Sequence, residues 1–308
     1  FHERAQGMAP EMLNTRPAPQ VAILHSDTSG RFQGFIQDYV VWTYGPRVAE
    51  ANYNRIEAIG WGHLLDCLHL AHDVLVEEQV RAGALANYPM LIAPAVQALP
   101  ADVCERLREF VSNGGTLIAT SALGLYGDDM ETKGTGQLAD VLGADFAGFR
   151  GHSTVAESPM NWPRCDSGLY NVLPWTPNPA KAQANSDSLR TLFCSFTPRP
   201  GATVLETFTD GQPAVVMNAF GKGRATAIGY PLGRECFLSD TYHMHYGNNW
   251  PDCPDSSVFT QGLCNWLERL FAKLPFERQA NVIEEVAPRS SSVDASWPSG
   301  FMPRAMQE

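Results

Sequence analysis

The chain has 308 residues, of which 44% are hydrophobic and 18% charged, a composition typical of globular rather than disordered proteins. Its formal net charge is −11 and it has no run of Lys or Arg, which argues against nucleic acid or an anionic membrane as a partner. No apolar run approaches the roughly 18 residues that a membrane span requires.

The N-terminal residues 1–14 are expected to be the end of an upstream helix or module. The chain starts with Phe1 and shows neither the basic nor the apolar region of a signal peptide. It continues into Arg16–Pro19, which reads as a stiff, extended linker. A compact domain spanning residues 15–274 is therefore predicted.

Short apolar runs and helical spacing alternate in the first part of the chain. Four runs predict strands buried on both faces, at residues 21–24, 74–76, 90–93 and 116–119. Residues 48–71 follow helical spacing, and Ile59 and Cys67 are placed on the apolar stripe of that helix. A further helix begins at Pro100 and ends at Asn113–Gly115, because glycine accepts the left-handed conformation of a helix C-terminus. This alternation predicts an α/β fold, a parallel sheet with helices on both faces.

The regular pattern dissolves between residues 125 and 200, where Gly, Pro, Asp, Asn and Trp surround one short helix near Gln137–Leu142. A long irregular stretch of this kind is usually a functional loop or an interface element. Three antiparallel strands and a hairpin turn at Gly221–Gly223 then extend the sheet, at residues 203–208, 214–217 and 224–229. A last helix follows Asp255–Ser257, and the Pro- and Ser-rich residues 275–308 are an extended tail or the start of a further module.

The seven cysteines are scattered and form no CxxC motif. An odd number without a disulfide framework favours a reducing compartment, so we expect a bacterial cytoplasmic protein. Cys104, Cys194 and Cys264 lie in apolar segments and are interpreted as small core residues, while a bridge between Cys165 and Cys253 stays open.

Three segments carry a distinct helix–Gly-Gly–strand and Gly-Lys-Gly-Arg pattern, at Tyr88–Ala95, Leu99–Leu117 and Gly221–Gly229. Together they resemble the trimerisation (middle) domain of family-42-type β-galactosidases, which implies a class I glutamine-amidotransferase-like fold. In that family an upstream (β/α)8 barrel carries two catalytic glutamates, and a barrel of about 250 residues has no room before residue 15. The resemblance therefore implies a domain that holds subunits together and can line a neighbour's sugar cleft.

We predict a flavodoxin-like or amidotransferase-like parallel sheet that serves as a non-catalytic assembly domain of a β-galactosidase-like glycoside hydrolase and needs no cofactor. Its expected partners are further copies of itself in a trimer, a (β/α)8-barrel glycosidase chain or domain, or both, with carbohydrate as a possible ligand. The loops 150–200 and 240–255 would be presented to the neighbouring subunit or barrel. The alternative is a free-standing amidotransferase-like hydrolase or carbohydrate-binding module.

Ser121 falls where an amidotransferase-like fold keeps its nucleophile. A nucleophile elbow needs small residues two positions before and after, and Ala119 fits this requirement whereas Leu123 does not. The triad of that fold also uses a thiolate and a His-Pro-Glu segment, but Gly229–Arg234 contains neither His nor Glu. We interpret Ser121 as structural, with a catalytic nucleophile as the alternative.

The segment Thr241–Trp250 contains His243 and His245 in alternation. Two such histidines on a strand would point the same way and could bind a metal if a third ligand were present. In a loop rich in Asn and Gly, a carbohydrate cleft or an interface is the other interpretation, and plain packing is a third.

Aromatic residues in the irregular loops complete the candidates, because they anchor interfaces and stack on sugars. The expected substrate-binding or interface residues are Trp162, Trp175, Tyr242, His243, His245, Asn249 and Trp250. Two further segments, His25–Asp27 and Gly127–Asp129, follow strands of the parallel sheet, where such folds bind ligands. Helix capping and loop solvation are the alternative for both segments.

Overall fold

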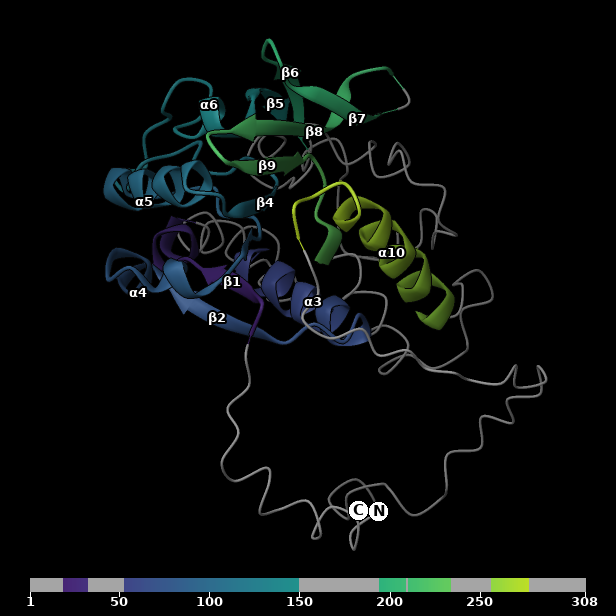
Figure 1. Ribbon diagram of the computed structural model, residues 1–308. Helices are drawn as coiled ribbons and strands as arrows, with labels where there is room; N and C mark the ends of the chain where they lie inside the picture. Colours follow the sequence, from purple (N-terminus) through teal and green to yellow (C-terminus); the bar gives the residue numbers. More distant parts are fainter. Residues whose placement is uncertain (1–18, 33–52, 150–193, 209, 234–255, 277–308) are drawn as a thin grey trace, which may run out of the picture. The chain divides into compact units, whose positions relative to one another are not determined.

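A computed structural model describes residues 19–32, 53–149, 194–208, 210–233 and 256–276, and the structural statements below concern these residues (Figure 1). Their strands form one large sheet and one two-stranded sheet. Within the described ranges, no helix is both long and apolar enough to cross a membrane.

The large sheet has seven strands in the order β2-β1-β3-β4-β9-β8-β7. These strands are β1 (Val21–His25), β2 (His72–Val76), β3 (Met90–Ala93), β4 (Thr116–Thr120), β7 (Thr203–Thr207), β8 (Pro213–Phe220) and β9 (Gly223–Ile228). The strands from β2 to β9 run parallel, whereas β8 pairs antiparallel with both β9 and β7. The parallel part has the strand order of flavodoxin-like folds, with β9 in the fifth place. The predicted parallel sheet with antiparallel strands towards the C-terminus is therefore confirmed.

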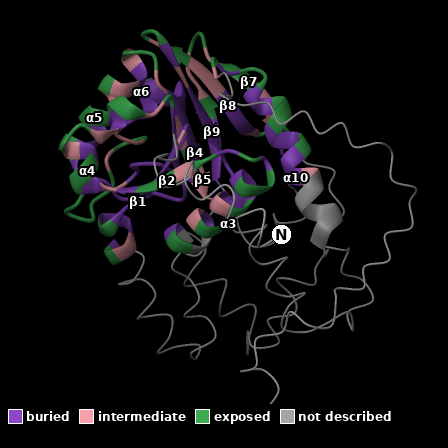
Figure 2. Ribbon diagram, turned by 60° about the horizontal axis from the view of Figure 1, so that its bottom comes forward, coloured by how far each residue is buried: buried purple, intermediate pink, exposed green. Residues whose placement is uncertain are grey.

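Helices cover both faces of this sheet, so the strands are buried between them (Figures 1 and 2). One face carries α3 (Tyr53–Cys67) and α10 (Ser256–Phe271). The other carries α4 (Glu77–Arg81), the 3-10 helix η2 (Ala84–Asn87), α5 (Ala101–Ser112) and α6 (Ala139–Leu142).

Strand side chains alternate between the two cores because successive residues of a strand point to opposite faces. Ile23, Ile92 and Ile118 join the core under α3 and α10. Their neighbours Leu24, Leu91 and Leu117 join the core under α4, α5 and α6. Each of these fully buried side chains contributes about 1.5–3 kcal/mol to folding before the loss of conformational entropy is counted.

The expected helix between Pro100 and Gly115 is present as α5. Pro100 is extended and precedes the first helical residue, and Gly114 ends the helix with a φ of 117°. The adjacent Gly223 lies so close to the carbonyls of Val111 and Gly115 that a Cβ would overlap them. The glycines at the end of α5 and the start of β9 therefore let the helix pack against the sheet backbone to backbone.

The predicted apolar stripe of α3 is wrong at two positions. Ile59 is 46% exposed and Cys67 is also exposed, whereas Leu64, which follows the predicted spacing, and Trp61 are fully buried. The buried stripe is rotated because two polar residues lie on it, Asn54 and Glu57. The Asn54 amide donates to the Pro94 carbonyl at 2.6 Å and the Trp61 indole donates to Glu57 Oε1 at 3.2 Å. Hydrogen bonding allows these polar side chains to be buried, which hydrophobic periodicity does not anticipate.

A second, antiparallel sheet of β5 (Ala144–Phe149) and β6 (Cys194–Pro198) was not predicted from the sequence. The pairing of the two strands is irregular near Gly148, where its register shifts. The two strands add Ala144, Cys194 and Phe196 to the core under α5 and α6. Phe149 pairs with Cys194, so the segment 150–193 has both its ends attached at neighbouring points.

Hydrogen bonds to Glu206 on β7 hold α10 on the sheet. The Trp266 indole donates to Glu206 Oε1 at 2.5 Å, and the Tyr230 hydroxyl donates to Glu206 Oε2 at 3.1 Å. The two aromatic rings lie 6.1 Å apart, and burial raises the pKa of the Tyr230 hydroxyl well above its ordinary value. The Trp266 indole is therefore buried with a hydrogen-bond partner, and Leu263 and Leu267 of the same helix are fully buried.

Candidate functional site

The carboxyl ends of the parallel strands meet at one edge of the sheet, and open α/β folds bind ligands there, where the strand order reverses. In this sheet the order reverses between β1 and β3. A helical segment follows β1 directly, over residues 27–32, and the loop after β3 runs through Ala98. These two segments and the start of α4 form the candidate site.

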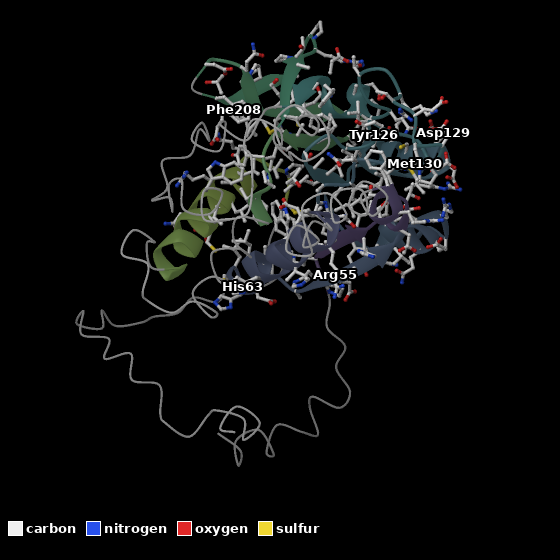
Figure 3. The ribbon with its side chains drawn as sticks, turned by 180° about the vertical axis from the view of Figure 1, so that it is seen from behind. Arg55, His63, Tyr126, Asp129, Met130 and Phe208 are labelled. Atoms are coloured by element: carbon white, nitrogen blue, oxygen red, sulfur yellow. The ribbon has the colours of Figure 1, made fainter. Side chains whose placement is uncertain are left out.

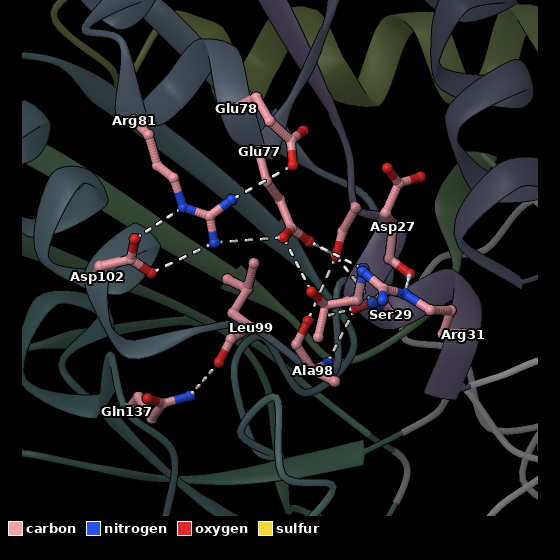
Figure 4. Close-up of polar contacts among 12 residues, drawn as sticks. Asp27, Ser29, Arg31, Glu77, Glu78, Arg81, Ala98, Leu99, Asp102 and Gln137 are labelled. Carbon is pink, nitrogen blue, oxygen red and sulfur yellow. Dashed lines mark hydrogen bonds and ion pairs between the residues drawn. The ribbon is translucent and has the colours of Figure 1, made fainter.

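The carboxylate of Glu77 lies at the start of the helical segment after β1 (Figure 4). Its Oε1 accepts hydrogen bonds from the Ser26 hydroxyl at 2.6 Å and from the Thr28 backbone N–H at 3.1 Å. Its Oε2 accepts one from the Thr28 hydroxyl at 2.9 Å, and Glu77 is only 2% exposed. An anion is favoured at this place because backbone N–H groups point there. Here the protein supplies that anion itself.

The Ser26 hydroxyl caps the same helical segment by accepting the backbone N–H of Ser29 at 2.9 Å. Ser29 in turn donates its hydroxyl to the Ala98 carbonyl at 2.7 Å and accepts the Ala98 N–H at 2.9 Å. The loop after β3 is thereby fixed to the helix after β1. In the segment His25–Asp27, Ser26 therefore acts as a helix cap. Asp27 is exposed, and its carboxylate lies 3.8 Å from the His25 imidazole.

Arg81 compensates the buried charge of Glu77 from the outside (Figure 4). Its guanidinium lies 3.9 Å from Glu77 Oε2 and donates to Asp102 Oδ2 at 2.7 Å. The hydrogen bond to Arg81 lowers the pKa of Asp102, and the same bond raises the pKa of Arg81. The ion pair of Arg81 with Asp102 connects α4 to the first turn of α5. Through Arg81, both helices contact the Glu77 carboxylate at the edge of the sheet.

Aromatic packing covers the next part of this edge. The Phe32 ring lies 4.4 Å from the Tyr126 ring, which joins the helical segment after β1 to the loop after β4. Tyr126 is half-buried, and burial raises the pKa of its hydroxyl. Beyond it, Asp129 pairs with Lys133 and accepts the Glu131 N–H at 3.0 Å, as expected for a solvated turn (Figure 3).

Ser121 has the backbone conformation of an elbow but not the surroundings of a nucleophile. Its φ is 61°, a left-handed value that a serine adopts only at a cost. The residue is 1% exposed, and its N–H donates to the Ile228 carbonyl at 2.8 Å. In the described part of the chain its hydroxyl contacts the Gln97 amide at 3.5 Å, and an amide cannot take up its proton. Leu123, two residues on, is 3% exposed and belongs to the core.

The aromatic and histidine candidates all fall outside the described residues: Trp162, Trp175, Tyr242, His243, His245, Asn249 and Trp250. Their segments are attached at described positions, since 150–193 joins β5 to β6 and 234–255 joins Gly233 to α10. Among the described residues, no group of three or more His, Cys, Asp or Glu side chains could hold a metal ion.

The sequence reasoning did not find Glu77 or Asn54. A signal for Glu77 was available, because it follows a strand directly and opens a helix, and acidic residues favour that position. Asn54 was hidden inside a helical pattern, yet its Oδ1 accepts the Ser26 N–H at 3.2 Å. Both side chains hydrogen-bond the segment that follows β1 at the carboxyl edge of the sheet.

The strand order and the helices on both faces define a flavodoxin-like domain of the α/β class, in which Glu77 fills the edge of the sheet between β1 and β3. The chain belongs to the β-galactosidase trimerisation domain family, whose sequence model matches residues 20–243. The family resemblance expected from the sequence is thereby confirmed.

Curated relatives include the β-galactosidase BgaB of Geobacillus sp., 31% identical over 176 residues, or 53% of this chain and 23% of the relative. The β-galactosidase Pbg of Clostridium perfringens is 29% identical over 171 residues, or 51% of this chain and 22% of the relative. The matched region thus spans under a quarter of those enzymes.

Solved structures of similar fold include Gan42B, a GH42 β-galactosidase, with a TM-score of 0.50 and 19% identity over 78% of this chain and 32% of that one. A β-galactosidase from Bacillus circulans sp. alkalophilus also has a TM-score of 0.50, with 17% identity over 86% of this chain and 34% of that one. At this identity the two structures show a shared fold.

Proposed function

We propose that this chain is the assembly domain of a β-galactosidase-like glycoside hydrolase, acting in the bacterial cytoplasm as a trimer. Catalysis would belong to a (β/α)8 barrel in the same or another chain. The family to which the chain belongs supports this proposal. The observation that carries it is the occupied edge of the sheet, where Glu77 takes the place of a bound anion.

The aromatic loops are proposed as the interface. Trp162 and Trp175 lie in the segment that leaves the small sheet, and Tyr242, His243 and Trp250 lie in the segment before α10. Aromatic side chains at the centre of an interface contribute most of its binding energy. Together the two loops would bury more than about 1,000 Å² and, with His245 and Asn249, line the sugar cleft of the neighbouring subunit.

Sedimentation velocity of the purified chain tests this proposal. We expect a species of three times the monomer mass at micromolar concentration and no turnover of an aryl-galactoside. Replacing Trp162 and Trp175 by Ala should shift the protein towards monomer and leave its unfolding curve unchanged. Ile59→Ser is the matched control, because Ile59 is 46% exposed on α3 and lies outside the proposed interface. A trimer lost with Ile59→Ser and kept with the tryptophan variants would place the interface on α3 instead.

A free-standing hydrolase is the second candidate, and the left-handed φ of Ser121 favours it. An enzyme of this kind would turn over an aryl-galactoside or a glutamine analogue without any barrel partner. Its activity would disappear in Ser121→Ala and persist in Ser112→Ala, a serine at the end of α5 on the opposite edge of the sheet. Absence of turnover in the wild-type chain rejects this candidate.

A further inference from the structure

One side of α3 carries a narrow, largely solvent-facing stripe of four residues: Arg55, Ile59, Gly62 and Asp66. They recur every three or four positions, so at 3.6 residues per turn they lie within about 60° of one another around the helix axis. Arg55, near the start of the helix, is exposed, Ile59 is 46% exposed, and the side chain of Asp66 is 73% exposed (Figure 3). The stripe is therefore basic at its first end, apolar in its middle and acidic at its last end.

Gly62 leaves a hollow in the middle of this stripe. A glycine inside a helix costs about 1 kcal/mol relative to alanine. The backbone of Gly233 excludes any side chain at Gly60, whereas a Cβ at position 62 would meet only the His72 imidazole, 3.3 Å from Nε2. The packing of the chain thus accounts for Gly60 better than for Gly62. A glycine on an open helix surface lets another backbone or side chain approach closely.

The edge strand next to Gly62 adds a second exposed apolar group on the same face. Val74 on β2 is 56% exposed. It pairs in register with Ile23, whose side chain belongs to the core under α3, so the Val74 side chain also points to the α3 face. Among the described strands, β2 pairs with β1 alone and ends the sheet. The exposed apolar groups of this face therefore come from a helix and from the edge strand beside it.

We propose that α3 packs antiparallel against α3 of a second copy of this chain, about a two-fold axis at the middle of the helix. That alignment places Arg55 opposite Asp66 of the partner subunit. It also places Ile59 opposite Gly62 of the partner subunit, because both pairs are symmetric about the same point in the sequence. Each contact occurs twice, as in every isologous interface.

Charge and shape both favour this occupant. An antiparallel second copy brings the basic end of one stripe to the acidic end of the other, whereas a parallel copy would place like charges side by side. The Arg55 guanidinium carries five N–H donors, so it can hold a carboxylate of the partner together with contacts inside its own chain. The Ile59 side chain would enter the hollow above Gly62 of the partner subunit, the knob-and-hole packing of paired helices.

This contact is separate from the proposed trimer. A surface that binds its own copy about a two-fold axis joins two chains and cannot close a ring of three. It would pair two trimers, or two single chains where no trimer forms. One pair of helices buries a small area, so we expect weak association that is seen at high protein concentration and weakens as salt is added.

Sedimentation velocity over a concentration series tests the contact in the full chain carrying Trp162→Ala and Trp175→Ala, where the loops no longer contribute. We expect an equilibrium between one species and another of twice its mass. Arg55→Asp and Asp66→Arg should each raise the dissociation constant at least about tenfold, because like charges then face each other twice. An equal mixture of the two variants should associate as strongly as the parent, since a wholly acidic stripe then faces a wholly basic one.

Two further variants complete the test. Ile59→Ser should weaken the pairing while leaving the trimer of the chain with wild-type loops intact. Arg106→Asp is the matched control, because Arg106 is exposed on α5 and pairs with Glu109, and it should keep the pairing. Circular dichroism melting verifies that each variant is folded.

Three results would overturn the proposal: no species of twice the mass, pairing that ignores both charge reversals, or a mixture of the two variants that fails to associate. Failure of the trimer proposal is read separately, from the chain with wild-type loops at micromolar concentration.

Discussion

Gly60 on α3 and Gly233 after β9 lie backbone against backbone, with no room for a side chain on either. A Cβ at position 60 would overlap the Gly233 carbonyl, and a Cβ at position 233 would overlap the Glu57 carbonyl. Because both obstacles are backbone atoms, no change of rotamer can relieve them. The contact sets the depth at which α3 packs against the carboxyl end of β9.

Gly60→Ala is therefore expected to lower the free energy of unfolding by roughly 2–4 kcal/mol, even though alanine is the better helix former. Chemical denaturation followed by circular dichroism measures the change. Gly30→Ala is the control, because nothing lies within 4 Å of a Cβ at that helical position. It should leave stability unchanged or raise it by about 0.5–1 kcal/mol. Equal behaviour of the two variants would show that α3 is free to shift.

Glu77→Gln tests the occupied edge of the sheet. The amide oxygen can take the place of Oε1 and keep the bonds from the Ser26 hydroxyl and the Thr28 N–H, but the NH2 group then takes the place of Oε2, so the Thr28 hydroxyl loses its acceptor. We expect a loss of about 2–3 kcal/mol in unfolding free energy. The neighbouring Glu78 is exposed, and Glu78→Gln should change stability by less than about 0.5 kcal/mol. A Glu77→Gln protein as stable as wild type would contradict the assigned hydrogen bonds.

Two buried threonines offer a paired test of polar burial. The hydroxyl of Thr226 has no hydrogen-bond partner among the described residues, whereas the hydroxyl of Thr120 accepts the Ala95 N–H at 3.0 Å. Thr226→Val removes an unpaired polar group and should stabilise the protein by about 1 kcal/mol. Thr120→Val removes the hydroxyl that accepts the Ala95 N–H and should destabilise the protein by about 1–3 kcal/mol. Thermal unfolding of both variants measures the contrast, which disappears if a water molecule bonds Thr226.

The ion pair of Asp145 with Arg199 predicts a dependence on pH. The hydrogen bond from Arg199, at 2.6 Å, and then that from Thr135 lower the pKa of Asp145. A carboxyl group with a lowered pKa stabilises the folded state fully above its unfolded pKa of about 3.9 and loses that contribution as the pH falls through its folded pKa. Asp145→Asn should therefore cost about 0.5–1 kcal/mol near neutral pH, with the difference from wild type shrinking below about pH 4.

Urea unfolding at a series of pH values measures that difference. Asp128→Asn serves as the control because Asp128 is exposed on a turn, and its unfolding free energy near neutral pH should stay within about 0.5 kcal/mol of wild type. A constant gap between Asp145→Asn and wild type down to low pH would mean that the pair contributes through packing rather than charge.

Much of the scaffold could be predicted from local patterns. Runs such as Met90–Ala93 and Thr116–Thr120 are buried on both faces, so their composition alone identifies them as strands of a parallel sheet. The phase of α3 could not be predicted, because Asn54 is buried through bonds to Ser26 and Pro94, which are far away in sequence, and Glu57 is buried through a bond to the Trp61 indole one turn later. The strand Ala144–Phe149 was hidden for a similar reason, since its pairing partner, β6, begins only at Cys194.

The candidate site was predicted less well than the scaffold. Ser121 was found because its position follows from the strand before it, and its left-handed φ agrees with a sharp turn. Glu77 was missed because its role arises only when three separate segments come together at the edge of the sheet. The aromatic candidates at Trp162 and Trp250 lie outside the described residues and remain predictions.

The pairing of Phe149 with Cys194 fixes both ends of the segment between them at neighbouring positions, so the length of this segment can change without moving its ends. Its two attachment points are neighbours on a small sheet of their own, so a longer or shorter insert need not disturb the seven-stranded sheet. The entropic cost of closing such a loop grows only with the logarithm of its length. Related chains could thus differ in the length of this segment at little cost to the stability of the seven-stranded sheet.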